Sequence, residues 1–129
     1  MIDRIQIIEA GDDEEQAFMQ AKRPEPVDVF LREARRSLRA GRIVFLDRVL
    51  SDLSRLGITK TEAVDMLIDL APSHLHKGPE ADRNMPGEIW VFDYHSDVHG
   101  QLYIKLKLVS EAERRVLCIS LHEWGLGPR

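Results

Sequence analysis

Two segments decide the fold of this chain: LYIKLKLV at residues 102–109 and VLCISLH at residues 116–122. Apolar and polar side chains alternate along both segments, which is typical of half-buried β-strands. The polar connection SEAERR at residues 110–115 lies between them, so we predict an antiparallel β-hairpin. One face of such a hairpin is apolar and packs on a core, and the other face is polar.

The register of this hairpin can be constrained, because a slip of one residue would exchange the two faces. The symmetric register places Tyr103 opposite His122 and Leu106 opposite Ile119. A slip of two residues would change these partners without changing the faces. The predicted polar face carries Tyr103, Lys105, Lys107, Ser120 and His122.

Three helices are predicted ahead of these strands. Apolar residues recur at helical spacing over residues 27–38 and again over residues 46–56, and a glycine follows each run as a C-cap. The third helix begins at the capping box TKTE, residues 59–62, whose first and last side chains bond to each other's backbone amides. This helix ends at Pro72.

The rest of the chain completes the predicted fold class. Residues 73–87 are polar and contain two prolines, so we expect a loop there. Residues 89–94, IWVFDY, are rich in β-formers and predict a further strand. Three helices followed by three strands predict an α+β domain, with the three N-terminal helices packed on one face of a small antiparallel sheet.

Length and charge set the boundaries of this domain. The chain has 129 residues and a net charge of −4 at pH 7. Residues 1–26 hold seven acidic and three basic residues, which accounts for the whole surplus. We interpret them as an acidic, partly disordered N-terminal arm, and we predict that residues 27–129 form a single domain.

Cysteine content and hydropathy indicate the cellular compartment. The one cysteine, Cys118, excludes an intramolecular disulfide, and we expect it at the edge of the core and not as a nucleophile. No apolar window is long enough to span a bilayer. These features predict a cytoplasmic protein without membrane contact.

The polar sheet face is the main candidate for chemistry. The ordinary interpretation is a solvated outer face, as in many antiparallel sheets. Two features favour phosphate chemistry: no acidic residue balances its lysines at the inner positions, and a phenol and an imidazole accompany them. A metal held by residues 93–99, or by His74 and His76, is a weaker alternative, and we predict neither a metal nor a cofactor.

Six short motifs follow one another in order: AG at residues 40–41, LG at 56–57, LHKGPE at 75–80, IW at 89–90, GQLYIKL at 100–106 and ISLH at 119–122. Taken together, they resemble the MqsR family of bacterial toxins, which are messenger-RNA interferases with a RelE-like fold. The resemblance extends from about Val27 to His122, which is most of the chain outside the acidic arm.

The resemblance implies a toxin of a type II toxin–antitoxin system that cleaves messenger RNA without a metal ion. In this reaction the RNA 2′-hydroxyl attacks the adjacent phosphorus and leaves a 2′,3′-cyclic phosphate. The implied partners are messenger RNA and a cognate antitoxin, a DNA-binding protein encoded next to the toxin, with ribosome association left open. The alternative is a non-catalytic module that binds a protein or RNA with the same basic face.

The resemblance also assigns roles to residues. Lys77, Tyr103 and His122 fall on functional positions of the family, and Lys105 follows its Tyr-x-Lys pattern. We expect His122 to protonate the leaving oxygen, and the two lysines to stabilise charge on the phosphorane. Tyr103 is expected to position the phosphate or to stack on a base.

Three departures from the family pattern are present. Lysine can occupy the last-strand position where this chain has His122, which keeps the capacity for proton transfer. A polar residue can follow the strand tryptophan, whereas Val91 follows it here, and this change concerns sequence preference. The acidic arm has no counterpart. Further RNA contacts are expected at Lys107, Arg83 and Trp90, and Glu80 is a candidate base.

Overall fold

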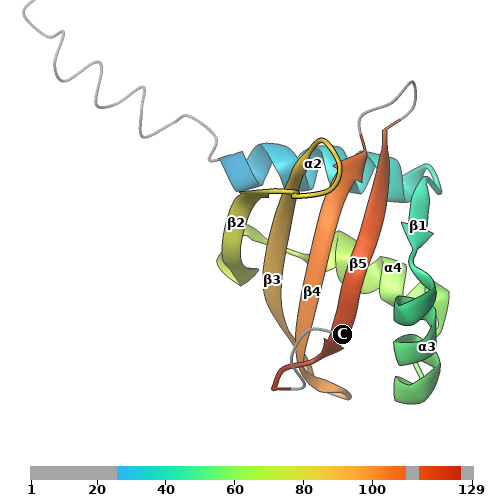
Figure 1. Ribbon diagram of the computed structural model, residues 1–129. Helices are drawn as coiled ribbons and strands as arrows, with labels where there is room; N and C mark the ends of the chain where they lie inside the picture. Colours follow the sequence, from blue (N-terminus) through green and yellow to red (C-terminus); the bar gives the residue numbers. More distant parts are fainter. Residues whose placement is uncertain (1–25, 110–113, 126–129) are drawn as a thin grey trace, which may run out of the picture.

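The fold is taken from a computed structural model, which describes residues 26–109 and 114–125 (Figure 1). The predicted acidic arm lies outside the described residues except for Pro26. The elements in chain order are α2 (Pro26–Arg39), β1 (Ile43–Phe45), α3 (Asp47–Leu56), α4 (Lys60–Asp69), the short 3₁₀ helix η1 (Pro72–His74), β2 (Leu75–Ala81), β3 (Glu88–Ser96), β4 (Gly100–Val109) and β5 (Arg115–Glu123).

The three predicted helices are confirmed. The capping box of α4 is present, with the Thr59 amide 2.8 Å from a Glu62 carboxylate oxygen and the Glu62 amide 3.0 Å from the Thr59 hydroxyl. Helix α3 ends at Gly57, which has a φ of 74° and donates its amide to the last turn. That left-handed conformation suits glycine, because it has no Cβ.

The predicted sheet was antiparallel, and this is wrong for one edge. The five strands are ordered β1-β5-β4-β3-β2, and β1 pairs with β5 in parallel while the other pairs are antiparallel. Strand β1 lies between α2 and α3, so the helices do not all precede the sheet. The three residues of β1 are too few to show a period of two. They therefore read as the beginning of the next helix.

The predicted loop over residues 73–87 is also partly wrong, because β2 occupies half of it. This edge strand pairs with β3, and its register shifts twice, between Leu75 and Lys77 and again between Lys77 and Glu80. The shifts remove the regular alternation that would reveal a strand in the sequence. Residues 82–87 do form a loop, which leads into β3.

The core lies between the helices and one face of the sheet. Helices α2 and α4 pass behind the sheet in Figure 1, so that view looks onto the other face. Phe30 of α2 stacks on Trp90 at 4.9 Å and lies 6.2 Å from Phe92, measured between ring centroids. The largest side chains in this core are fully buried: Leu31, Leu67, Leu70, Phe92, Leu102, Ile104, Leu106 and Leu121.

The hairpin of β4 and β5 follows the predicted register in its first half only. Tyr103 pairs with His122 as predicted, but a bulge at Ile119 shifts the remainder, so that Leu106 pairs with Cys118 and not with Ile119. A bulge adds one residue to one strand and reverses its faces beyond that point. Cys118 is consequently in the core and not at its edge, and burial raises the pKa of its thiol to about 12.

Candidate active site

The face of the sheet opposite the helices, here called the outer face, carries all four residues expected to be catalytic. Lys77 of β2 and Lys105 of β4 both pair with Val91 of β3, so the two lysines lie on either side of it. Two strand spacings separate their backbones by about 10 Å. Tyr103 and His122 form the neighbouring cross-strand pair.

Tyr103 and His122 are in direct contact. Their rings stack with centroids 5.1 Å apart and an angle of 14° between the ring planes. The bulge at Ile119 lies on the other side of this pair from Glu123, so the register that joins the two rings is the regular part of the hairpin. The structure therefore brings together the phenol and the imidazole that the sequence placed on one face.

The backbone determines which nitrogen of His122 can exchange a proton. The Nδ1 atom lies 2.8 Å from the carbonyl oxygen of Glu123. A carbonyl only accepts hydrogen bonds, so Nδ1 carries the hydrogen and donates it. The Nε2 atom is buried and has no hydrogen-bond partner in the described part of the chain.

Helix α3 anchors the end of β5 that holds His122. The Glu123 carboxylate receives two hydrogen bonds of 2.9 Å from the Arg55 guanidinium, which also contacts Asp52 at 3.3 Å. The hydrogen bonds to Glu123 and then to Asp52 raise the pKa of Arg55 above its ordinary value. The paired geometry fixes Glu123, whose carbonyl in turn orients the imidazole.

Two residues of this cluster were missed by the sequence analysis as site residues. Trp124 meets Tyr103 edge-on at 5.1 Å and His76 edge-on at 5.0 Å between ring centroids. Trp124 continues the alternation of β5 two residues after His122, and this spacing could have placed it on the same face. His76 lies at the first register shift of β2, which no pattern in the sequence indicates.

The lysines differ in how their charge is balanced. The Lys77 ammonium is 3.7 Å from Glu80, and both side chains are about half exposed, so this pair is weak. Among residues 26–109 and 114–125, no acidic side chain forms an ion pair with Lys105, which is partly exposed. Lys105 is thus the cation of the four whose charge is most available to a ligand.

Lys107 is balanced by an acid, contrary to the expectation that the lysines of this face lack one. Its ammonium lies 2.6 Å from the Asp82 carboxylate, and only 4% of the residue is exposed. This hydrogen bond is the main cause of a lowered pKa of Asp82. The loop over residues 82–87 also covers the Lys107 stem, since a Cβ added to Gly87 would lie 2.7 Å from its Cε. Lys107 is therefore not available for the RNA contact expected of it.

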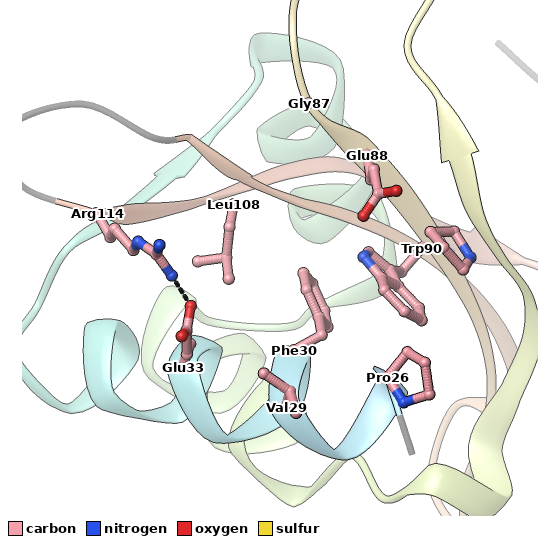
Figure 2. Close-up of a pocket in the computed structure, with 10 residues that line it drawn as sticks. Pro26, Val29, Phe30, Glu33, Gly87, Glu88, Trp90, Leu108 and Arg114 are labelled. Carbon is pink, nitrogen blue, oxygen red and sulfur yellow. Dashed lines mark ion pairs between the residues drawn. The ribbon is translucent and has the colours of Figure 1, made fainter. Parts of the chain in front are cut away.

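The other two expected RNA contacts are placed differently. Arg83 is exposed in the loop over residues 82–87. Trp90 is on the opposite, helix-covered face, where it is 5% exposed. It lines a cavity of about 620 Å³ with Phe30 and Leu108, near the ion pair of Glu33 and Arg114 (Figure 2). The strand alternation that places Val91 outside puts Trp90 inside, so the expected RNA contact at Trp90 does not fit its position.

The weaker metal candidates have other partners. His74 accepts a hydrogen bond from the Ala71 amide at 2.9 Å, and His95 contacts Gln101 at 3.1 Å and Asp97 at 3.6 Å. Asp93 accepts a hydrogen bond from Gln101. Across the described residues, no group of three or more histidine, cysteine, aspartate or glutamate side chains could hold a metal ion.

The comparisons with known proteins define first a class and then a family. A family model described as "Motility quorum-sensing regulator, toxin of MqsA" matches residues 28–123, which is well over half of the chain. The chain is thus a toxin of a toxin–antitoxin system, a class whose members have a cognate antitoxin. It belongs to the MqsR toxin family, as the motifs predicted. No curated protein matches the chain. No helix in the described residues is long and apolar enough to cross a membrane.

Proposed function

We propose that this toxin is a metal-independent endoribonuclease that cleaves messenger RNA on the outer face of its sheet. The RNA 2′-hydroxyl attacks the adjacent phosphorus, the bond to the 5′-oxygen breaks, and the products are a 2′,3′-cyclic phosphate and a 5′-hydroxyl end. The proposal rests on the family and on the grouping of Lys77, Lys105, Tyr103 and His122.

The observation that carries the proposal is the hydrogen bond from His122 Nδ1 to the Glu123 carbonyl. It commits one nitrogen to the backbone and leaves Nε2 as the atom that exchanges a proton. In the imidazolium form, Nε2 donates its proton to the departing 5′-oxygen as a general acid. Such a group contributes roughly 10²–10⁴-fold to a rate.

The remaining roles follow from charge. Lys105 and Lys77 stabilise the negative charge that develops on the phosphorane, and each preorganised donor of this kind is worth about 2–4 kcal/mol. Glu80, beside Lys77 at 3.7 Å, is the candidate base that removes the proton of the 2′-hydroxyl. Tyr103 positions the phosphate or stacks on a base, and Arg83 is a secondary backbone contact.

The partners follow from the class and the chemistry. The cognate antitoxin is proposed to be a DNA-binding protein encoded next to the toxin, and cleavage is proposed to take place in the cytoplasm. Ribosome association would affect which messages are cut but not the chemistry of the cut. The rival function is a module that binds RNA or protein through the outer face without cleavage.

The test is incubation of the purified protein with ribosome-free RNA in EDTA, followed by mapping of the new ends. We expect 2′,3′-cyclic phosphates, and we expect a single 2′-deoxynucleotide at a mapped site to block the cut there, because the nucleophile is removed. Ends that carry a 3′-hydroxyl, or cutting at the deoxy position, would refute the mechanism. Saturable binding to RNA that stays intact, by a well-folded protein, would favour the rival.

A further inference from the structure

A chain of four aromatic rings crosses the outer face from β5 to the edge strand β2. His122 stacks on Tyr103, Tyr103 meets Trp124 edge-on, and Trp124 meets His76 edge-on, with each pair of centroids 5.0–5.1 Å apart. Trp124 is the member that connects the two sides of the face. It lies just beyond residues 28–123, which the family model matches, so the family assigns it no role.

Trp124 also carries an unpaired donor. Its indole nitrogen, Nε1, is buried and has no hydrogen-bond partner in the part of the chain that the structure describes. An indole N–H can only donate, and buried polar atoms without partners are rare because they lose their bonds to water. The other buried side-chain atom in this condition is Nε2 of His122, which contacts the same tyrosine.

The position of Trp124 is fixed by its surroundings. Its backbone amide donates to the carbonyl of Gln101 at 3.1 Å, and the preceding residue, Glu123, is held by Arg55. Two rings contact the indole itself. A donor held this firmly is preorganised, so a ligand would lose little conformational freedom of the protein when it binds there.

We propose that Trp124 is an RNA-binding residue of the active site, and that its indole N–H donates a hydrogen bond to a phosphate oxygen of the bound RNA. The inference rests on the proposed ribonuclease function and adds a residue to its site. Because Nε1 is covered in the free protein, a neighbouring side chain must move when RNA binds. His76 is exposed on the edge strand and is the neighbour with room to do so.

A phosphate oxygen fits the chemistry of the surroundings best. The nearby charged groups are cationic: Lys105 lies two residues from Tyr103 on β4, and Lys77 follows His76 on β2. Phosphate oxygens receive most of the hydrogen bonds between proteins and nucleic acids, and they accept without donating. A donor-only group beside two cations therefore favours an anionic acceptor.

The test compares Trp124→Phe with the wild type in binding a single-stranded DNA that has the sequence of a cleaved RNA. This probe keeps the phosphates but lacks the 2′-hydroxyl, so it is bound without being cut. Phenylalanine keeps most of the ring contacts and removes only the N–H. We expect affinity to fall about tenfold while the melting temperature stays equal or rises, because an unpaired buried donor has been removed.

Trp90→Phe is the matched control, because it makes the same change on the helix-covered face. It should lower the melting temperature and leave binding unchanged. It also leaves Trp124 as the one tryptophan of the chain, and we expect its fluorescence to change when the DNA is added. Unchanged affinity of Trp124→Phe, or a melting temperature that falls as far as in the control, would overturn the inference.

The outcomes also separate this inference from the proposed function. If the wild type binds DNA and cuts RNA but Trp124→Phe binds equally well, only the role of Trp124 is refuted. If the wild type binds DNA with the expected dependence on Trp124 but leaves RNA intact, the catalytic proposal is refuted and the binding role stands. A wild type that neither binds nor cuts would overturn both.

Discussion

At the scale of single residues, the outer face contains two kinds of cation. Lys107 is buried against Asp82, so its charge is already compensated inside the protein, whereas Lys105 has no such acid among the described residues. Alternation along β4 placed both lysines on one face but could not distinguish them. The distinction comes from the loop over residues 82–87, whose path the sequence did not reveal. A structural lysine and a functional lysine are thus neighbours on one strand.

The pairing of Asp82 with Lys107 predicts how stability depends on pH. The hydrogen bond from Lys107 lowers the pKa of Asp82 in the folded protein, so the stabilisation is present above the unfolded pKa and is lost as the pH falls through the folded value. Asp82→Asn should therefore lower the melting temperature at neutral pH, since it leaves the Lys107 ammonium buried beside a neutral amide. The difference from the wild type should shrink below about pH 4.

Thermal unfolding of both proteins from pH 3 to pH 7 makes this measurement. Asp97→Asn is the control, because Asp97 is fully exposed and its melting temperature curve should follow that of the wild type. A constant difference between Asp82→Asn and the wild type across this range would show that the ion pair does not contribute as described.

At the scale of elements, the position of β2 depends on how closely its backbone approaches β3. A Cβ added to Gly78 would lie 3.0 Å from the carbonyl oxygen of Ile89 and 3.1 Å from the Cα of Trp90. Both of those atoms belong to the backbone of β3, so they cannot move aside easily. Gly78 has a φ of 136°, which side-chain-bearing residues rarely adopt. The glycine next to Lys77 thus sets where that lysine lies.

Gly78→Ala should consequently reduce cleavage by more than it reduces stability. We expect β2 to move away from β3 and to carry Lys77 out of position, with a fall in kcat/KM of about tenfold or more. The free energy of unfolding should fall by about 1 kcal/mol or somewhat more. Single-turnover cleavage and urea unfolding of the same preparation give both values.

Gly57→Ala is the matched control for this prediction. Gly57 also has a positive φ, 74°, but a Cβ there would meet no atom within 4 Å. This substitution should cost stability through the backbone alone and leave the rate of cleavage per folded molecule unchanged. If both variants cut RNA at the wild-type rate, the position of β2 does not matter for the reaction.

Elements differ in how well the sequence predicted them, for physical reasons. The helices were predicted because their apolar stripes are long and their caps are local, as at Thr59 and Gly57. Strand β1 is too short to show a period, and β2 has its period broken by two register shifts. The bulge at Ile119 depends on packing in the finished sheet and leaves no local pattern. Segments with irregular pairing are therefore where the sequence analysis failed.

At the scale of the whole molecule, the sheet separates structure from proposed chemistry. Its inner face is covered by α2 and α4 and holds the core, while its outer face holds the stacked Tyr103 and His122 and the lysines (Figure 1). The alternation in two strands was enough to predict which side chains share the outer face. It could not predict Trp124 and His76 as members, because those contacts depend on the end of β5 and on the first shift in β2.

The central claim is that His122 moves a proton during RNA cleavage on the outer face, and one comparison tests it most directly. The single-turnover rate of RNA cleavage in EDTA is measured for the wild type, His122→Ala and His99→Ala. His99 lies in the turn between β3 and β4, outside the proposed site, so its variant controls for the loss of a histidine. We expect His122→Ala to lose roughly 10²-fold or more in rate with its fold intact, and His99→Ala to match the wild type. Cleavage by His122→Ala at the wild-type rate would contradict the account.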